Sequence, residues 1–215
     1  MTESIQTRVH GHVQIKDSLG NVLMDKTNAI HTGNMATVIA RGLSNAVHAS
    51  IFKLKLGNQG TYIDSSQQIV FRPANTTGVT ADLYNPTYVE IVDDADAGVG
   101  VGNSVTFTNI PASTSTRVIV TCVISANEAV NRPTDLPDGA TASSGGLDGI
   151  GIGAAIPTEG QYFFDELGLF AAGLGTPDLL NETDELMLSH LIFSPIEHTG
   201  NRELTVVYSV TISVT

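Results

Sequence analysis

The most regular pattern in the sequence is an alternation of apolar and polar residues near residue 215. In the stretch ELTVVYSVTISVT, which begins at Glu203, every second residue is apolar from Leu204 to Val214. Successive side chains of a β-strand point to opposite faces, so this period predicts a long strand with one buried face. The residues on that face are Leu204, Val206, Tyr208, Val210, Ile212 and Val214.

The same alternation appears in two other places. RVHGHVQIKD (8–17) is followed by the turn residues SLGN and by VLMD, which predicts an N-terminal hairpin. STRVIVTCVISAN (115–127) predicts a second alternating strand. The residues expected to face inward are Val9, Val13 and Ile15 in the hairpin, and Val118, Val120, Cys122 and Ile124 in the second strand.

One segment has helical spacing. In TGNMATVIARGLSNAV, apolar and small residues recur three and four positions apart, which predicts an α-helix over about 33–46. Thr32 or Asn34 is suited to cap its N-terminus. The residues that follow the helical spacing are Met35, Val38, Ile39, Gly42, Leu43 and Ala46.

The rest of the chain is predicted to be strands and loops. Further strands are expected at IFKLKLG (51–57), TYVEIVDD (87–94) and SVTFTNIPA (104–112), whereas GNQGTYIDSSQQ (57–68) is expected to be a loop. Long irregular loops are expected at about 72–86 and 131–160. Many short strands separated by turn residues indicate a mainly β fold, a β-sandwich or a jelly-roll-like domain, formed by residues 1–215 as one domain.

Composition and charge exclude several function classes. Charged residues make up only 15% of the chain and the formal net charge is −12. An acidic chain without clustered Lys and Arg argues against nucleic acid and against an anionic membrane surface as partners. The single cysteine, Cys122, excludes an internal disulfide and lies in an apolar alternation typical of a buried thiol. No apolar run is long enough to span a membrane.

Three motifs suggest ligands but fit them poorly. GIGIGA (149–154) has the dinucleotide spacing without the flanking strand and helix, so we expect a loop and no cofactor. Asp94 and Asp96 in DDADAG resemble part of a calcium loop that lacks the remaining ligands. His10 and His12 would share one face of a strand, as metal ligands do, but have no evident partner in the sequence. Solvent-exposed polar positions are the alternative reading of all four residues.

The stretch YFFDELGLFAA (162–172) places two adjacent carboxylates, Asp165 and Glu166, in an apolar run. Strict alternation would put them on opposite faces, which argues against a shared catalytic role. Gly168 is expected to permit a bend or bulge. Because a half-buried carboxylate needs a partner, we expect at least one of the two acids to bind backbone N–H groups of a turn or an arginine, with Arg117 and Arg202 as candidates.

Three segments in this order resemble the attachment domains of tailed-phage fibre proteins, which carry an ALGDG-like strand and a later REIGLF-like strand. The segments are IFKLKLGNQG (51–60), YFFDELGLFAA (162–172) and LMLSHLIFSPIEHTGNRELTVVYSVTI (186–212). The opening stretch from Val9 to Asn45 resembles virion proteins of cyanophage-like viruses that are known only as structural. The resemblance implies a virion component. Because the given sequence has no repetitive shaft or tip region after the last predicted strand, we expect an adaptor, collar or decoration subunit and not a fibre.

The expected function is therefore non-enzymatic assembly in a tailed-phage virion, built in the cytoplasm of the bacterial host. The expected location is the tail, baseplate or neck, as an adaptor or collar-type subunit for fibres. The expected partners are copies of the chain itself, in a trimer or ring, and other virion proteins. A capsid decoration protein and a glycan- or receptor-binding β module remain alternatives, as does a hydrolase that uses Asp165 and Glu166.

Overall fold

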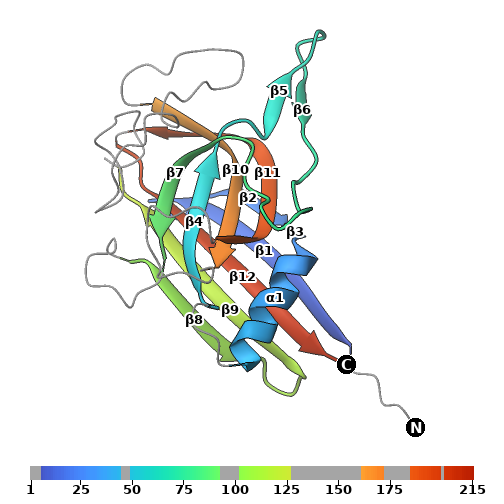
Figure 1. Ribbon diagram of the computed structural model, residues 1–215. Helices are drawn as coiled ribbons and strands as arrows, with labels where there is room; N and C mark the ends of the chain where they lie inside the picture. Colours follow the sequence, from blue (N-terminus) through green and yellow to red (C-terminus); the bar gives the residue numbers. More distant parts are fainter. Residues whose placement is uncertain (1–5, 45–48, 93–101, 127–160, 172–184, 200) are drawn as a thin grey trace.

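The computed structural model describes residues 6–44, 49–92, 102–126, 161–171, 185–199 and 201–215. It confirms a mainly β fold built from two antiparallel sheets that pack as a sandwich (Figure 1). Among the described residues, no helix has the length and hydrophobicity needed to cross a membrane. Of the predicted long loops, 72–85 contains no strand or helix, and 131–160 lies outside the described residues.

The first sheet, called the β12 sheet, has the strand order β2-β1-β12-β9-β8. Its strands are β1 (Thr7–Asp17), β2 (Val22–Thr27), β8 (Ser104–Asn109), β9 (Ser115–Ile124) and β12 (Leu204–Val214). The predicted hairpin and the two alternating strands all lie in this sheet. β12 is at its centre, paired with β1 on one side and β9 on the other. Both edges of β12 are therefore paired within the chain.

The second sheet, called the β10 sheet, has the order β3-β11-β10-β4-β7. Its strands are β3 (Ala29–Ile30), β4 (Ile51–Gly57), β7 (Pro86–Ile91), β10 (Gln161–Ala171) and β11 (Leu186–Thr199). β5 (Thr61–Ile63) and β6 (Ile69–Phe71) form a separate two-stranded hairpin. β5 lies in the stretch 57–68 that was expected to be a loop, and β6 follows directly after that stretch. Strands of only three residues carry too little alternation to stand out in the sequence.

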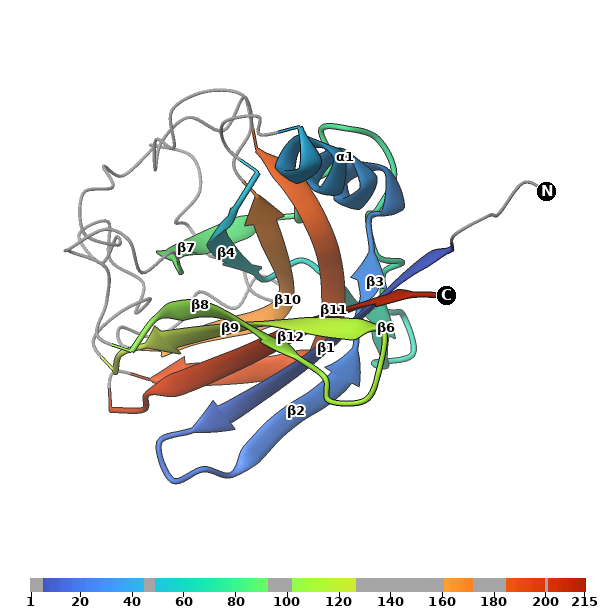
Figure 2. The same ribbon diagram turned by 90° about the horizontal axis from the view of Figure 1, so that it is seen from below.

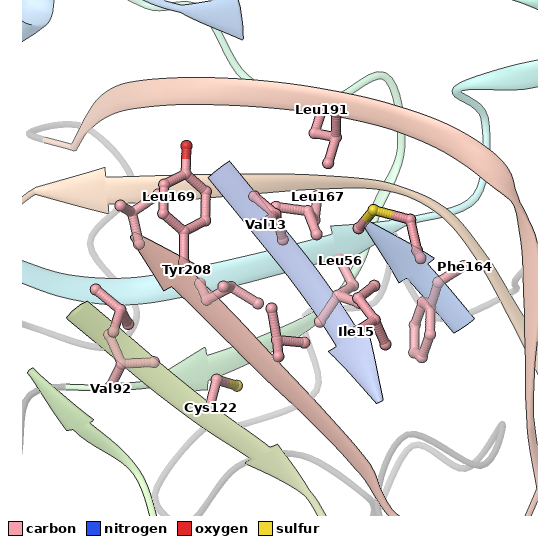
Figure 3. Close-up of a cluster of buried hydrophobic side chains, with 14 of the residues drawn as sticks. Val13, Ile15, Leu56, Val92, Cys122, Phe164, Leu167, Leu169, Leu191 and Tyr208 are labelled. Carbon is pink, nitrogen blue, oxygen red and sulfur yellow. The ribbon is translucent and has the colours of Figure 1, made fainter. Parts of the chain in front are cut away.

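The main core lies between the two sheets (Figure 3). The alternation in the sequence predicted its β12 side correctly from Leu204 to Val210, where every second residue is buried, as are Val13, Ile15 and Cys122. The prediction fails at the end of the strand, where Val214 is 41% exposed. Buried side chains of the β10 sheet close the core from the opposite side: Leu54, Leu56, Phe164, Leu167, Leu169, Leu188, Leu191 and Phe193. The face of β1, β9 and β12 that the alternation predicted to be buried is therefore the face that packs against the β10 sheet.

The helix α1 (Thr32–Leu43) packs beside β11 (Figure 2). Its N-cap is His31, and not Thr32 or Asn34 as expected. The His31 Nδ1 atom accepts the Asn34 backbone N–H at 3.1 Å, so its ring proton lies on Nε2, which donates to the Gly78 carbonyl at 2.7 Å. Met35 is buried as predicted, but Leu43 is 86% exposed because the helix ends there, with Ser44 as its C-cap.

The two ends of the described chain lie side by side. The Gln6 backbone N–H donates to the Thr215 carbonyl at 2.8 Å, and the Thr215 N–H donates back to the Gln6 carbonyl at 2.9 Å. These bonds continue the β1–β12 ladder by one more pair. The first and last described residues are therefore fixed at the same end of the β12 sheet, where β1 begins and β12 ends.

Candidate functional site

The two adjacent acids of β10 lie at an irregularity of the strand. The pairing of β10 with β11 shifts register between Phe164 and Glu166. Phe164 and Leu167 both point into the main core, although strict alternation would place them on opposite faces. This bulge overturns the expectation that Asp165 and Glu166 point to opposite sides. Both carboxylates instead meet the segment that follows β4.

Asp165 binds the start of the β5–β6 hairpin. Its Oδ1 accepts the Gly60 backbone N–H at 2.8 Å, and its Oδ2 accepts the Thr61 N–H at 2.9 Å and the Thr61 hydroxyl at 2.5 Å. Burial raises the pKa of the Asp165 carboxyl above its ordinary value; these hydrogen bonds lower it part of the way back, and the neighbouring Glu166 charge raises it further. The predicted contact with backbone N–H groups of a turn is confirmed.

Glu166 binds two chain segments and a histidine. Its Oε1 accepts backbone N–H groups of Asn85 at 2.9 Å and Gln59 at 3.3 Å. Its Oε2 accepts the Tyr84 N–H at 3.0 Å and lies 3.0 Å from Nε2 of His190. All four lone-pair directions of this fully buried carboxylate are thus used within the fold.

His190 on β11 pairs with Gly168 on β10, and its side chain lies on the same side of the sheet as Glu166. Its Nδ1 accepts the Asn75 backbone N–H at 2.8 Å, which assigns the ring proton to Nε2 and makes His190 the donor to Glu166. The Tyr84 ring packs against the imidazole with centroids 5.7 Å apart. His190 therefore links Glu166 to the irregular segment 72–85.

Segment 72–85 covers the outer face of the β10 sheet. Ala81 and Leu83 form a second small apolar cluster with Phe52, Phe170 and Met187. Within the segment, the Tyr84 hydroxyl donates to the Pro73 carbonyl at 2.8 Å, and the Asn75 side-chain amide donates to the Asp82 carbonyl at 2.9 Å. The segment is therefore an ordered part of the fold that buries the acid cluster.

Two buried lysines of β4 join this cover to the sheet. The Lys55 Nζ atom lies 2.9 Å from Asp82 Oδ2, 2.9 Å from Glu185 Oε2 and 4.4 Å from the centre of the Phe170 ring. Lys53 pairs with the other oxygen of Glu185. Burying such charges costs free energy unless they are paired, so these contacts fix Asp82 and Glu185 over the sheet.

A bend or bulge was expected at Gly168, and the nearest bulge against β11 follows it, between Leu169 and Phe170. Gly168 itself keeps regular pairing with both His190 and Lys55. A Cβ at this position would lie 2.8 Å from the Phe170 ring and 3.1 Å from Leu83. The glycine therefore gives the covering segment room to approach the sheet.

The two candidate arginines do not bind these acids. Arg202 instead lies 3.7 Å from Asp17 and donates to the Glu197 carbonyl at 3.3 Å. Arg117 is exposed on β9 and pairs with Thr211 of β12, in the β12 sheet, whereas the two acids lie in the β10 sheet. Asp165 and Glu166 instead accept hydrogen bonds from backbone groups of residues 59–61 and 84–85, together with the Thr61 hydroxyl and the His190 ring.

The metal candidates lie apart from this cluster. His10 and His12 share the exposed face of β1, where His12 Nε2 lies 2.6 Å from Asp25 Oδ1. Asp94 and Asp96 lie outside the described residues. Within the part of the chain that the structure describes, no group of three or more His, Cys, Asp or Glu side chains is placed to hold a metal ion.

Sequence reasoning missed His190, Lys53 and Lys55. Each is a lone polar residue in an apolar strand, within LMLSHLIF and IFKLKLG. A polar residue that recurs inside a fully apolar run is a signal that both faces of the strand are covered. No family model, curated protein or solved structure matches the chain.

Proposed function

We propose that this chain is a non-enzymatic structural protein of a tailed-phage virion. It acts by oligomeric assembly at the tail, baseplate or neck, as an adaptor or collar-type subunit for fibres. The observation that supports the proposal is the pairing of two motifs that carry the resemblance to fibre-attachment domains. LGNQG ends β4 and DELGLF forms β10, and the two strands are neighbours in one sheet.

The hydrogen bonds that Asp165 and Glu166 accept favour a structural role for these acids over a catalytic one. General acid–base catalysis needs a carboxyl group that can exchange a proton with a substrate. Asp165 and Glu166 are buried, and their oxygens accept hydrogen bonds from backbone groups of residues 59–61 and 84–85. Their role in the described structure is to fix the β5–β6 hairpin and the covering segment to the sheet.

Cryo-electron microscopy of the virion that contains this chain tests the proposal. We expect density that fits the sandwich in a three-, six- or twelve-fold ring on the tail axis. Density repeated over the facets of the head would replace this proposal with a capsid decoration role. Absence of the chain from purified particles would overturn the virion assignment altogether.

A further inference from the structure

The β5–β6 hairpin stands away from both five-stranded sheets (Figure 1). Its two strands pair only with each other, with Ile63 opposite Ile69 and Thr61 opposite Phe71. Both outer edges of the ribbon therefore carry backbone groups that no strand of the described chain pairs. A two-stranded ribbon is marginal by itself, and a third or fourth strand with an apolar face stabilises it.

The hairpin carries a concentration of exposed apolar side chains. Ile63, Ile69 and Phe71 share one face and are 45%, 50% and 45% exposed, and Tyr62 on the other face is 45% exposed. Lys26 lies over the Phe71 ring with Nζ 5.1 Å from its centre. The facing pair Ile63 and Ile69 thus forms the apolar patch at the outer part of the ribbon.

The ribbon is held in a defined shape. Asp165 fixes its base through Gly60 and Thr61, and the Arg72 N–H donates to the Gly60 carbonyl at 2.8 Å. At the tip, Asp64 Oδ1 accepts the N–H groups of Ser66 and Gln68 at 2.8 and 2.9 Å. A preordered surface loses little conformational entropy when it binds, which favours association.

Charge indicates which partner fits. Residues 58–72 contain one acid, Asp64, and one base, Arg72, in a chain whose formal net charge is −12. Asp64 is used in the turn, and the Arg72 guanidinium lies over the rings of Tyr62 and Tyr84, 5.8 and 5.0 Å from their centres. The hairpin is therefore a neutral surface on which two copies of an acidic chain can meet without local repulsion.

We propose that the β5–β6 hairpin binds the same hairpin of a second copy of this chain. The two ribbons join edge to edge through β6 into a four-stranded sheet, in which Ile69 of each copy lies beside the apolar β6 side chains of the other. This inference deepens the proposed assembly function and rests on it for its setting in the virion. It also assigns a role in assembly to Asp165, because that carboxylate sets the direction in which the hairpin extends from the two five-stranded sheets.

The contact is small. Ile63, Ile69 and Phe71, at roughly 200 Å² each and about half exposed, offer at most roughly 300 Å² per copy on their shared face. Two copies then bury at most roughly 600 Å², less than the roughly 1,200 Å² of a stable interface. We expect weak, concentration-dependent pairing in solution, which becomes effective when several copies are held together in a particle.

Sedimentation velocity of the full chain, from micromolar to millimolar concentration, tests the inference. Ile69→Glu places like charges against each other at the contact, and we expect it to weaken association at least about tenfold. Leu19→Glu is the matched control, because it makes the same kind of change at an 85% exposed position in the β1–β2 turn. Circular dichroism melting verifies that both variants keep the fold.

Variants of opposite charge at position 69 identify the partner of the hairpin. If Ile69 faces a second copy, mixing the Ile69→Glu and Ile69→Lys variants restores pairing that neither shows alone. Association of Ile69→Glu equal to that of the unaltered chain overturns the hairpin contact and leaves assembly through another surface. An unaltered chain that stays monomeric at all concentrations also overturns the inference, whereas the function proposed above is decided separately by its location in the virion.

Discussion

Gly57 faces Glu166 across the β4–β10 ladder, so closely that a Cβ on Gly57 would lie 2.5 Å from Oε1 of the carboxylate. The Asn85 carbonyl blocks the same space. The Gly57→Ala substitution must therefore push apart the two strands or the covering segment, and we expect it to lower the free energy of unfolding by about 2 kcal/mol. Chemical denaturation measures this change.

Gly42 in α1 is the matched control for Gly57. A Cβ at Gly42 meets no atom within 4 Å. The Gly42→Ala substitution is expected to raise the free energy of unfolding by about 0.5–1 kcal/mol through helix propensity. Equal effects at the two glycines would contradict the close packing at Gly57.

The Glu166→Gln variant tests the hydrogen bonds of the acid cluster. Glutamine supplies one acceptor oxygen and one donor group, so N–H groups that now bind Glu166 would face another N–H donor. We expect a loss of about 2–4 kcal/mol in the free energy of unfolding. Glu203→Gln, at a partly exposed position, should stay within about 0.5 kcal/mol of the unaltered chain.

His198 predicts a loss of stability in acid. Burial lowers the pKa of His198 from 6.5 to about 4, with a further downward contribution from Arg202 and an opposing one from backbone groups of Ile124 and Ser125. As the pH falls, His198 takes up a proton near pH 6.5 in the unfolded chain but only near pH 4 in the folded chain. The stabilisation is therefore complete above about pH 6.5 and is lost as the pH falls towards 4. The total is about 3 kcal/mol.

Thermal melting from pH 7 to pH 4 of the unaltered chain and of His198→Phe separates this contribution from others. The variant should lack the part of the acid-induced loss that His198 causes. Asp165 acts in the opposite direction, because its raised pKa favours the folded state at low pH, and it affects both proteins equally. Identical pH profiles would show that His198 does not contribute.

Lys55→Met tests the ion pairs that hold the covering segment. Removing the ammonium group takes one partner from Asp82, whose side chain is 36% exposed, and leaves the buried Glu185 with Lys53, at a cost of about 1–3 kcal/mol. Hydrogen exchange at the Asn75 and Tyr84 amides should accelerate, since both residues belong to segment 72–85. Lys16→Met on β1, a partly exposed position, should leave these exchange rates unchanged.

The sequence predicted what depends on local periodicity. The alternation from Leu204 to Val210 identified the buried face of β12, and the helical spacing near Met35 located α1. It did not reveal that β12 is central, because its neighbours β1 and β9 are distant in sequence. Partners of a strand are set by long-range packing that a local pattern does not contain.

The same limit explains the acid pair. That Asp165 or Glu166 needs a partner follows from the cost of burying a carboxylate, and this could be predicted. The direction in which they point depends on a bulge against β11, which is visible only once the register is known. The cap at His31 was missed for a related reason, because its other ring nitrogen is fixed by Gly78, far along the chain.

The pairing of Gln6 with Thr215 makes this sandwich a modular unit. Polypeptide joined before residue 6 and polypeptide joined after residue 215 would enter and leave at the same end of the β12 sheet, where β1 begins and β12 ends. Such a domain can be inserted into a loop of a host protein with little distortion. A label attached at either end also occupies nearly the same position. A fluorescent or gold tag attached to either end would therefore mark the same point in an assembled particle.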